Sequence, residues 1–479
     1  MKKFFAKNFA IIILIGIAFF LRCYRITNPI LDWHSFRQAD TASVTREYVK
    51  HGIDLLHPKY HDLSNIQSGH DNLDGYRMVE FPIVNAFVAQ LILLFPFLSL
   101  EVTSRVISIL FSLGMLLSLY FFVLPISGKR VAYTVLIVGA VLPYFVYYSR
   151  VIMPEPALLF FFVLSLTLFY YWLQQKKFWL YCASLIALLL ALLLKPFVIF
   201  IIPTFAVVAY CLEGKKIFKN WLLYPFPVLA VIPFLLWRNW ITAFPSGIPA
   251  NDWLFNGNHI RFRPAWFRWL FYERLIKLIL GYTGIIFFFT ALIRLKLEEI
   301  LIYGSWWIGI LVYFSVIATG NVQHDYYQVL LVPICIITLA RGIVMLEQIL
   351  QDRCNLSTSI SRAIALLVFS VGILFGWGQV RGYFNVNHWE YVAAGDAVQR
   401  LTPHDAKVIA PAFGDTMFLY QTDRTGWPIG FEIEKKRSLG ATHYITTSYD
   451  DEARELESQY FTIQKTPAYL LLDLTKKKN

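Results

Sequence analysis

Long apolar runs separated by short polar turns dominate the pattern along the chain. The first run, FAIIILIGIAFFLRCY, follows the basic start MKKFFAKN. The runs reach 16 to 20 residues, and a bilayer-spanning helix needs about 20. No small-residue cleavage site follows the first run, so we predict a retained helix rather than a signal peptide. Eleven further candidate helices centre near residues 90, 115, 140, 164, 186, 204, 229, 284, 309, 337 and 371.

Basic turns between the runs predict the orientation. Loops rich in Lys and Arg favour the cytoplasmic side, which places the N-terminus in the cytoplasm and the C-terminal region outside. This arrangement requires an odd number of crossings, whereas twelve segments are candidates. Segment 81–100 is the least certain of the candidate spans, because a proline lies near each end. Either this segment is re-entrant or only partly inserted, or a further span is hidden elsewhere in the chain. The basic turns lie at 127–130, 174–177, 213–219, 294–299 and 351–362.

The polar stretches define the expected domains. We predict an all-α polytopic membrane domain of about 11–13 transmembrane helices over residues 1–380. Its large outer loops cover 25–80 and 239–273, and the second suits the headgroup layer because it mixes Trp, Phe and Arg. Residues 381–479 alternate β-prone runs such as THYITTS with helix-like runs such as WEYVAAGDAVQRL. This alternation predicts a small extracytoplasmic α/β domain.

Composition supports a membrane protein and excludes several other classes. The chain is 57% hydrophobic and 15% charged, against about 25% charged for soluble domains. Its net charge of +12 follows from the basic turns, and no basic stripe on a soluble domain predicts a nucleic-acid partner. The five cysteines include no CxxC pair, so we expect neither a zinc site nor a disulfide framework. We expect an integral protein of the plasma (inner) membrane.

A dense polar cluster, LDWHSFRQADTASVTREYVKHG, follows the first apolar run. Ser35 and Gln38 have the spacing of a capping box, and Gly52 fits a helix end, so we predict an outer helix from about 36 to 51. Asp32 and His34 lie just before that helix. Arg37 and Asp40 are three residues apart and share a face. For an arbitrary surface helix such charges merely pair in solvent, but carboxylates near lipid are costly and usually functional.

Further polar residues occur at predicted outer ends of spans. Singly, each has an ordinary explanation, since Lys and Arg snorkel toward water and tyrosines belong to the aromatic belt. Their convergence with acids on one side is the informative feature. These residues are Glu80, Arg150, Glu155, Lys195, Arg238, His324, Tyr326 and Tyr327.

This combination suits the transfer of a sugar from a lipid phosphate to a hydroxyl group. Cations such as Arg37, Lys195 and Arg238, with Arg150 as a weaker candidate, can hold a phosphate and stabilise its charge as it leaves. A carboxylate can accept the proton of the attacking hydroxyl. We expect no cofactor, although carboxylates could hold a divalent metal ion. The expected partners are membrane lipid, a polyprenyl-phosphate sugar and a hydroxyl acceptor of the envelope: a glycan, a lipid or a protein.

The motifs HSFRQADTASVTREYVKHG, EFP, YYSRVIMPEP and HDYYQ resemble integral-membrane glycosyltransferases of the C superfamily. The similarity is greatest to the bacterial protein O-mannosyltransferase and aminoarabinose-transferase branch. It implies a polyprenyl-phosphate sugar donor and an acid in the first outer loop, where this chain offers Asp40 and Asp32. Glu155 matches a second acidic position of the family. We favour Asp40 as the general base, because a helix fixes it one turn from Arg37, and expect Asp32 to interact with the helix start.

Two other classes remain open. A transporter or flippase of a lipid-linked envelope precursor would show repeats, broken helices and ionisable residues near mid-membrane. The chain shows no internal repeat, and its acids lie at the ends of spans. A non-catalytic assembly protein would use the large tail to bind partners.

Overall fold

The computed structural model describes residues 2–478, with side chains from residue 9 onward. The chain divides into two compact units. The helical unit contains the chain up to Tyr24, Val106–Trp237 and Asn251–Gly382, and the mixed unit contains Arg25–Arg105, Arg238–Ala250 and Tyr383–Asn479. The expected boundary near residue 380 lies beside one join, but the first outer loop groups with the C-terminal region rather than with the membrane helices.

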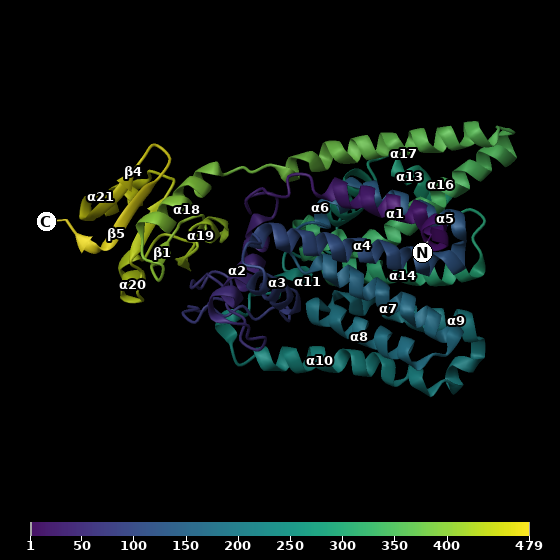
Figure 1. Cartoon of the computed structure of the whole chain (residues 1–479), viewed down its shortest axis with the longest axis horizontal. Helices are drawn as coiled ribbons and strands as arrows, with labels where there is room; N and C mark the ends of the chain where they lie inside the picture. Colours follow the sequence, from purple (N-terminus) through teal and green to yellow (C-terminus); the bar gives the residue numbers. More distant parts are fainter. Residues whose placement is uncertain (1, 479) are drawn as a thin grey trace. The chain divides into compact units, whose positions relative to one another are not determined.

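The helical unit is a bundle in which long helices run side by side (Figure 1). Within it α7 packs against α8, and α16 packs against α5, α13 and α17. Its α-helices are α1 (Lys2–Arg22), α4 (Leu100–Ser127), α5 (Lys129–Val141), α6 (Pro143–Tyr148), α7 (Glu155–Gln175), α8 (Phe178–Leu194), α9 (Pro203–Glu213), α10 (Pro225–Ile241), α11 (Trp253–Asn256), α12 (Pro264–Phe267), α13 (Gly284–Thr290), α14 (Leu297–Val316), α15 (Ala318–Gln323), α16 (Val332–Cys354) and α17 (Thr358–Val380), of which α4 and α10 extend across a unit boundary. Shorter or wider turns are η1 (Pro196–Ile201), η2 (Gly214–Lys219), η3 (Trp221–Leu223), the π-helix η5 (Arg268–Ile279) and η6 (Asp325–Leu331).

Seven helical stretches among the described residues are long and apolar enough to cross a membrane. Three shorter apolar helices cover Phe9–Arg22, Ile83–Leu94 and Phe178–Leu194. The predicted helical membrane fold is therefore confirmed, whereas fewer continuous spans occur than the 11–13 expected. The long stretches are Leu100–Ser127, Glu155–Gln175, Pro196–Lys219, Trp221–Ile241, Leu297–Val316, Asp325–Cys354 and Thr358–Leu401.

Local breaks account for the difference in helix number. The segment predicted near residue 140 divides into α5 and α6 at Pro143, which occupies the first position of α6. The segment near 284 is interrupted at Gly281 and Tyr282, whose φ angles are 55° and 60°. The suspect segment 81–100 forms α3 (Ile83–Leu94), whose 12 residues give about 18 Å, less than the ~30 Å hydrocarbon core.

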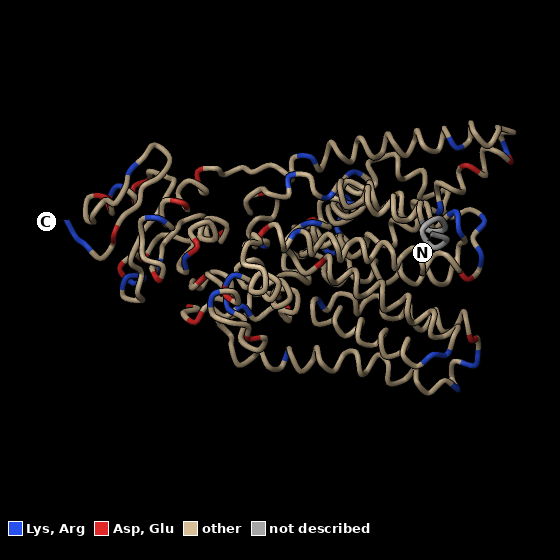
Figure 2. Tube along the Cα trace, viewed as in Figure 1, with Lys and Arg blue, Asp and Glu red and all other residues tan. Residues whose placement is uncertain are grey.

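Basic turns gather at one end of the helical unit (Figure 2). Ion pairs join them there: Arg130 and Arg362 both pair with Glu347, and Arg294 pairs with Asp352. Turns that the sequence placed on one side of the membrane, 127–130, 294–299 and 351–362, are therefore neighbours in space. This is the arrangement that the positive-inside rule predicts.

The mixed unit contains a five-stranded sheet of order β2-β1-β3-β5-β4. Strands β1 (Lys407–Ile409), β2 (Thr425–Trp427) and β3 (His443–Thr446) are parallel, and β4 (Tyr460–Lys465) and β5 (Leu470–Lys477) add an antiparallel edge. This sheet region confirms the predicted C-terminal α/β fold. The other elements are α2 (Ser35–His51), α3, η4 (Pro245–Gly247), η7 (Arg381–Phe384), α18 (Trp389–Leu401), α19 (Met417–Gln421), α20 (Ile433–Ser438) and α21 (Asp451–Gln459), with η7 at the join between the units.

The first outer loop completes this sheet and its core. Asp62 forms a parallel β-bridge with Gly426, the middle residue of β2. The amide of Leu63 donates to the Gly426 carbonyl at 2.8 Å, and the Gly426 amide donates to the His61 carbonyl at 2.9 Å. Leu31 lies in one apolar core of the sheet and Leu63 in the other. The loop and the C-terminal region thus share backbone hydrogen bonds and buried apolar surface, the two features of a single folding unit.

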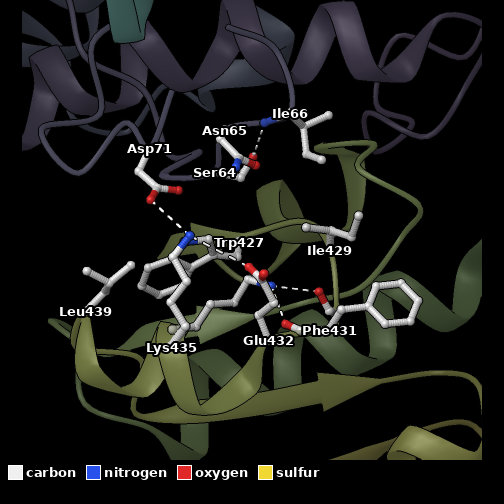
Figure 3. Close-up of a pocket in the computed structure, with 12 residues that line it drawn as sticks. Ser64, Asn65, Ile66, Asp71, Trp427, Ile429, Phe431, Glu432, Lys435 and Leu439 are labelled. Carbon is white, nitrogen blue, oxygen red and sulfur yellow. Dashed lines mark hydrogen bonds and ion pairs between the residues drawn. The ribbon is translucent and has the colours of Figure 1, made fainter. Parts of the chain in front are cut away.

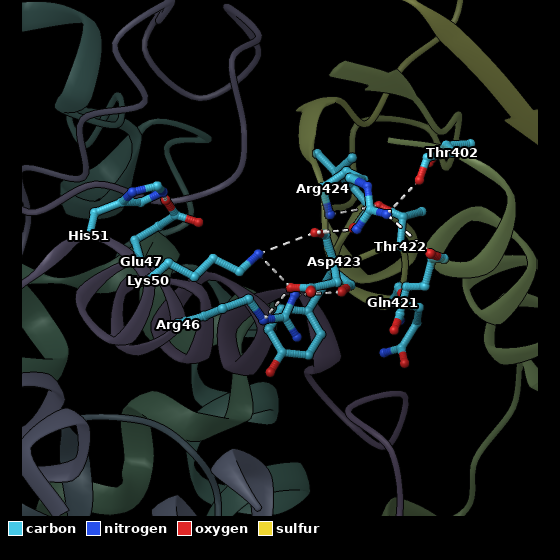
Figure 4. A network of polar contacts seen from close by, with 12 residues as sticks. Arg46, Glu47, Lys50, His51, Thr402, Gln421, Thr422, Asp423 and Arg424 are labelled. Carbon is cyan, nitrogen blue, oxygen red and sulfur yellow. Dashed lines mark hydrogen bonds and ion pairs between the residues drawn. The ribbon is translucent and has the colours of Figure 1, made fainter. Parts of the chain in front are cut away.

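A polar network fastens α2 to α19 (Figure 4). The Arg46 guanidinium lies over the Tyr420 ring, 3.7 Å from its centroid, and donates to the Tyr420 carbonyl at 2.8 Å. Asp423 forms ion pairs with Arg46 at 3.2 Å and with Lys50 at 2.8 Å. These contacts fix the orientation of the helix that carries the acids of the first loop.

Candidate active site

The start of α2 differs from the predicted capping box. His34 occupies the N-cap with a left-handed φ of 55°, and the helix begins at Ser35. The Ser35 hydroxyl contacts the Met417 sulfur at 3.0 Å, while Gln38 Nε2 donates to Asp32 Oδ1 at 2.7 Å. Gln38 therefore reaches back as expected, but it binds a carboxylate rather than the cap amide. The predicted end at Gly52 is confirmed, since its amide donates to the Tyr48 carbonyl.

Asp32 lies in a turn that Arg105 organises. Arg105 Nη1 donates to the carbonyls of Ile26, at 2.7 Å, and Asn28, and its Nη2 lies 3.8 Å from Asp32 Oδ2. Asp32 also precedes the positive end of α2, which favours an ionised carboxylate. The sequence did not point to Arg105, which lies 73 positions away in α4.

Asp40 is buried, with 1% of its surface exposed, and accepts from three donors of its own unit. Oδ2 accepts from Arg77 at 3.0 Å and Gln67 at 3.1 Å, and Oδ1 accepts from Thr416 at 2.7 Å. Arg77 and Gln67 belong to the first loop, and Thr416 precedes α19. Asp40 therefore joins three segments that are far apart in the sequence.

Arg37 and Glu80, both predicted substrate-binding residues, form a buried ion pair with each other. Arg37 does not pair with Asp40, which instead pairs with Arg77. Arg238 is half-buried near the end of α10, and no partner is found for it among the described residues.

Glu155 and Lys195 meet in the helical unit. Glu155 is the first residue of α7, and Lys195 caps the end of α8. Their side chains form an ion pair in which Glu155 is buried and Lys195 is half-buried. The Lys195 ammonium lies 5.2 Å from the ring centroid of Tyr326 and 5.5 Å from that of Tyr327. Among the described residues no donor reaches the buried Glu155 Oε2. The sequence thus identified four residues that the fold brings together.

The neighbouring segment His324–Leu331 adds an acid to this group. Asp325 is 1% exposed, accepts from the Tyr148 hydroxyl at 2.7 Å and lies 3.9 Å from Arg274. The His324 ring lies 5.4 Å from the Tyr326 ring. Arg150 is fully buried and donates to the Tyr24 carbonyl at 2.5 Å. Its guanidinium therefore fixes the backbone just after α1. The sequence did not point to Arg274, which lies one position beyond the predicted outer loop 239–273.

Burial perturbs several ionisable groups of the mixed unit, among them Asp62, Asp415 and His61. It raises the pKa of Asp62 to about 6 and that of Asp415 to about 6, because an apolar environment disfavours the charged carboxylate. It lowers the pKa of His61 to about 4, since the imidazole accommodates a charge equally poorly. The Asp40 charge raises all three values as a lesser cause, so these groups surround the same carboxylate.

No cluster of three or more His, Cys, Asp or Glu side chains suited to a metal ion occurs in the part of the chain that the structure describes. A divalent ion at these sites remains an untested expectation.

The chain resembles known proteins in sequence and in fold. Residues 12–244 match the family model of dolichyl-phosphate-mannose-protein mannosyltransferases. The fold is similar to that of ArnT from Cupriavidus metallidurans bound to undecaprenyl phosphate, with a TM-score of 0.67, 13% identity, and coverage of 97% of this chain and 98% of that chain. No curated protein gives a significant sequence match.

Two further solved structures share the fold. Archaeal oligosaccharyltransferase AglB from Archaeoglobus fulgidus, in complex with an inhibitory peptide and a dolichol-phosphate, has a TM-score of 0.57 at 11% identity, covering 98% of this chain and 74% of that chain. Arabinofuranosyltransferase AftD from Mycobacteria has a TM-score of 0.56 at 10% identity, covering 97% of this chain and 41% of that chain. The chain therefore has the fold that its resemblance to integral-membrane C-superfamily glycosyltransferases implied.

Proposed function

We propose that the protein transfers a sugar from a polyprenyl-phosphate donor to a hydroxyl acceptor of the envelope at the outer face of the plasma membrane. The family match is to enzymes that use a lipid-phosphate sugar, and two of the similar structures hold a polyprenyl phosphate. The basic turns clustered at one end of the helical unit support an N-terminus in the cytoplasm (Figure 2).

The observation that carries this proposal is the Glu155–Lys195 pair beside Tyr326 and Tyr327. A half-buried ammonium that faces aromatic rings can exchange a carboxylate partner for the donor phosphate, a charge-assisted contact. Glu155 Oε2, which lacks a donor among the described residues, can accept from a sugar hydroxyl. Lys195 would then stabilise the charge that grows on the phosphate as it leaves.

For the general base we favour Asp32, which reverses the order that the sequence suggested. Protonating Asp40 would remove the negative charge that Arg77 faces at 3.0 Å in a buried site. Arg105 lies 3.8 Å from Asp32, a longer separation than that of Arg77 from Asp40, and Gln38 donates to Asp32 Oδ1 at 2.7 Å. Transfer of a proton to Asp32 would disrupt a looser ion pair than transfer to Asp40, so we assign the acceptor proton to Asp32.

In the proposed reaction the acceptor oxygen forms a bond to the anomeric carbon of the sugar. The bond between that carbon and the phosphate oxygen breaks, and the electron pair remains on the polyprenyl phosphate. The acceptor proton passes to Asp32. Atoms and charge balance without a nucleotide or a redox partner.

Transfer from defined donors tests the proposal. Purified protein is incubated with radiolabelled polyprenyl-phosphate hexoses and pentoses and with extracted envelope acceptors. Label should move to an acceptor and polyprenyl phosphate should be released in equal amount. Movement of an intact donor across a vesicle membrane without cleavage would instead establish a transporter or flippase.

A further inference from the structure

Two phenylalanines are exposed where parallel strands of the mixed unit end. Phe413 follows β1 and is 105% exposed, and Phe431 follows β2 and is 71% exposed. Both have left-handed backbones, with φ of 55° and 60°. An aromatic side chain exposed to water is unfavourable, and so is a left-handed backbone at a residue other than glycine. Residues with these features are often found at binding sites.

A cavity of about 120 Å³ adjoins these loops (Figure 3). Ser64, Asn65 and Ile66 of the first loop line one side, and Phe431 and Glu432 line another. Ile66 also packs against the loop of Phe413, since its side chain lies 3.1 Å from the position of a Cβ on Gly414. The amides of Ala412 and Gly414 donate to the Pro428 carbonyl at 2.9 and 3.0 Å, which ties the two loops together.

The charges of this cavity are already compensated. The Lys435 ammonium lies 3.2 Å from Asp71 and 3.7 Å from Glu432. The Lys436 ammonium donates to the carbonyls of Gly430 and Phe431, each at 2.6 Å. The cavity therefore presents paired charges and backbone and side-chain oxygens beside exposed rings, a lining that suits a ligand with hydroxyl groups and apolar faces. A saccharide has both.

We propose that Phe413, Phe431 and the cavity form a saccharide-binding edge that holds neutral sugar units of the acceptor. This inference rests on the proposed function. The position is the one at which open sheets bind ligands, beyond the carboxyl ends of parallel strands. Carboxylates and amides of the cavity meet the hydroxyls, and the exposed rings pack on the apolar faces of the sugars.

Photo-crosslinking tests the proposal without any donor. Benzoylphenylalanine replaces Phe413 or Phe431 in the full chain, and Phe461, exposed on β4, is the matched control. The probe is the neutral oligosaccharide fraction released from extracted envelopes and labelled with a fluorescent hydrazide. Illumination should label the two edge variants several-fold more than the control. Equal labelling of all three, cross-linking to peptide or lipid only, or absence of labelling would overturn the proposal.

Anisotropy of the same probe supplies a second measurement that needs no photoreactive variant. Phe431→Ala should weaken binding about tenfold, the effect of losing one packed ring, and Phe461→Ala should not. In transfer assays Phe431→Ala should raise the acceptor KM while kcat and the donor KM stay constant. Saccharide binding without transfer by the unaltered chain would refute the proposed function alone, whereas transfer with unchanged probe binding in Phe431→Ala would refute the edge alone.

Discussion

Asparagine in place of Asp40 removes one charge from a site where three segments of the mixed unit converge. The substitution keeps the size and shape of the side chain. It replaces one carboxylate oxygen by an NH2 group that cannot accept a hydrogen bond. Either Arg77 and Gln67 together, at Oδ2, or Thr416, at Oδ1, therefore lose their acceptor. Arg77 then lies buried without its ionic partner.

The expected magnitude follows from these contacts. Removing one member of a buried ion pair costs about 3–5 kcal/mol, because the remaining charge is uncompensated. Gln67 and Thr416 are neutral donors whose loss costs about 1 kcal/mol each. The amide retains part of the network, so the lower end of the range, ~3 kcal/mol, is expected for Asp40→Asn.

Thermal unfolding of the purified protein, followed by tryptophan fluorescence, measures this change, and initial rates at a temperature where both proteins are folded measure activity. Asp40→Asn should melt earlier and retain most of its turnover per folded molecule. Asp54→Asn is the matched control: this loop carboxylate is exposed and pairs with His57, so its loss should stay within about 1 kcal/mol. An Asp40→Asn protein that melts normally and has lost turnover would refute the reasoning and assign the base to Asp40.

Three further substitutions test other parts of the structure. Lys195→Met combined with Glu155→Gln removes the ion pair without leaving a lone charge. The double variant should bind a polyprenyl-phosphate sugar about 1.5–3 kcal/mol more weakly in equilibrium binding. Unchanged affinity would show that the pair only joins α7 to α8. In the folded chain the pKa of Asp62 is about 6, so the free energy of unfolding falls as pH rises from about 4 to 6. Relative to the unaltered chain, Asp62→Asn should therefore gain up to about 3 kcal/mol of stability between pH 4 and 7. A difference in melting temperature that does not change with pH would contradict this. Arg46→Ala should cost ~2 kcal/mol by removing a stacked, charge-assisted contact with α19, whereas Lys50→Ala, at a half-exposed pair, should cost less than about 1; equal melting shifts would argue against the stacking.

The sequence predicted the parts of the fold that local pattern controls. Apolar runs marked the helices, and alternating short runs marked the C-terminal sheet. Breaks such as Pro143 and Gly281 divide runs that hydropathy alone treats as continuous. The junction of the first loop with the sheet could not be predicted, because it depends on long-range pairing between Leu63 and Gly426.

The candidate site follows the same division. The sequence predicted the group of polar residues in the helical unit, because each member is a polar or aromatic residue at the end of an apolar run. The members are Glu155, Lys195, Tyr326 and Tyr327. The preference for Asp40 came from spacing along one helix, which shows Arg37 as the neighbour. In the fold the partners of Asp40 are Arg77, Gln67 and Thr416, which lie in other segments of the chain. Helical periodicity predicts neighbours only within one helix, so it could not indicate these contacts.

The initial rate of sugar transfer by Asp32→Asn, measured with a labelled polyprenyl-phosphate sugar and an envelope acceptor, tests the central claim most directly. General-base catalysis contributes about 10²–10⁴-fold, so the rate per folded molecule should fall by that order while donor affinity stays near that of the unaltered chain. The melting temperature should also fall, because Asp32→Asn removes the carboxylate that faces the buried Arg105, so rates are compared at a temperature where both proteins are folded. A variant that transfers sugar at an undiminished rate would contradict the account.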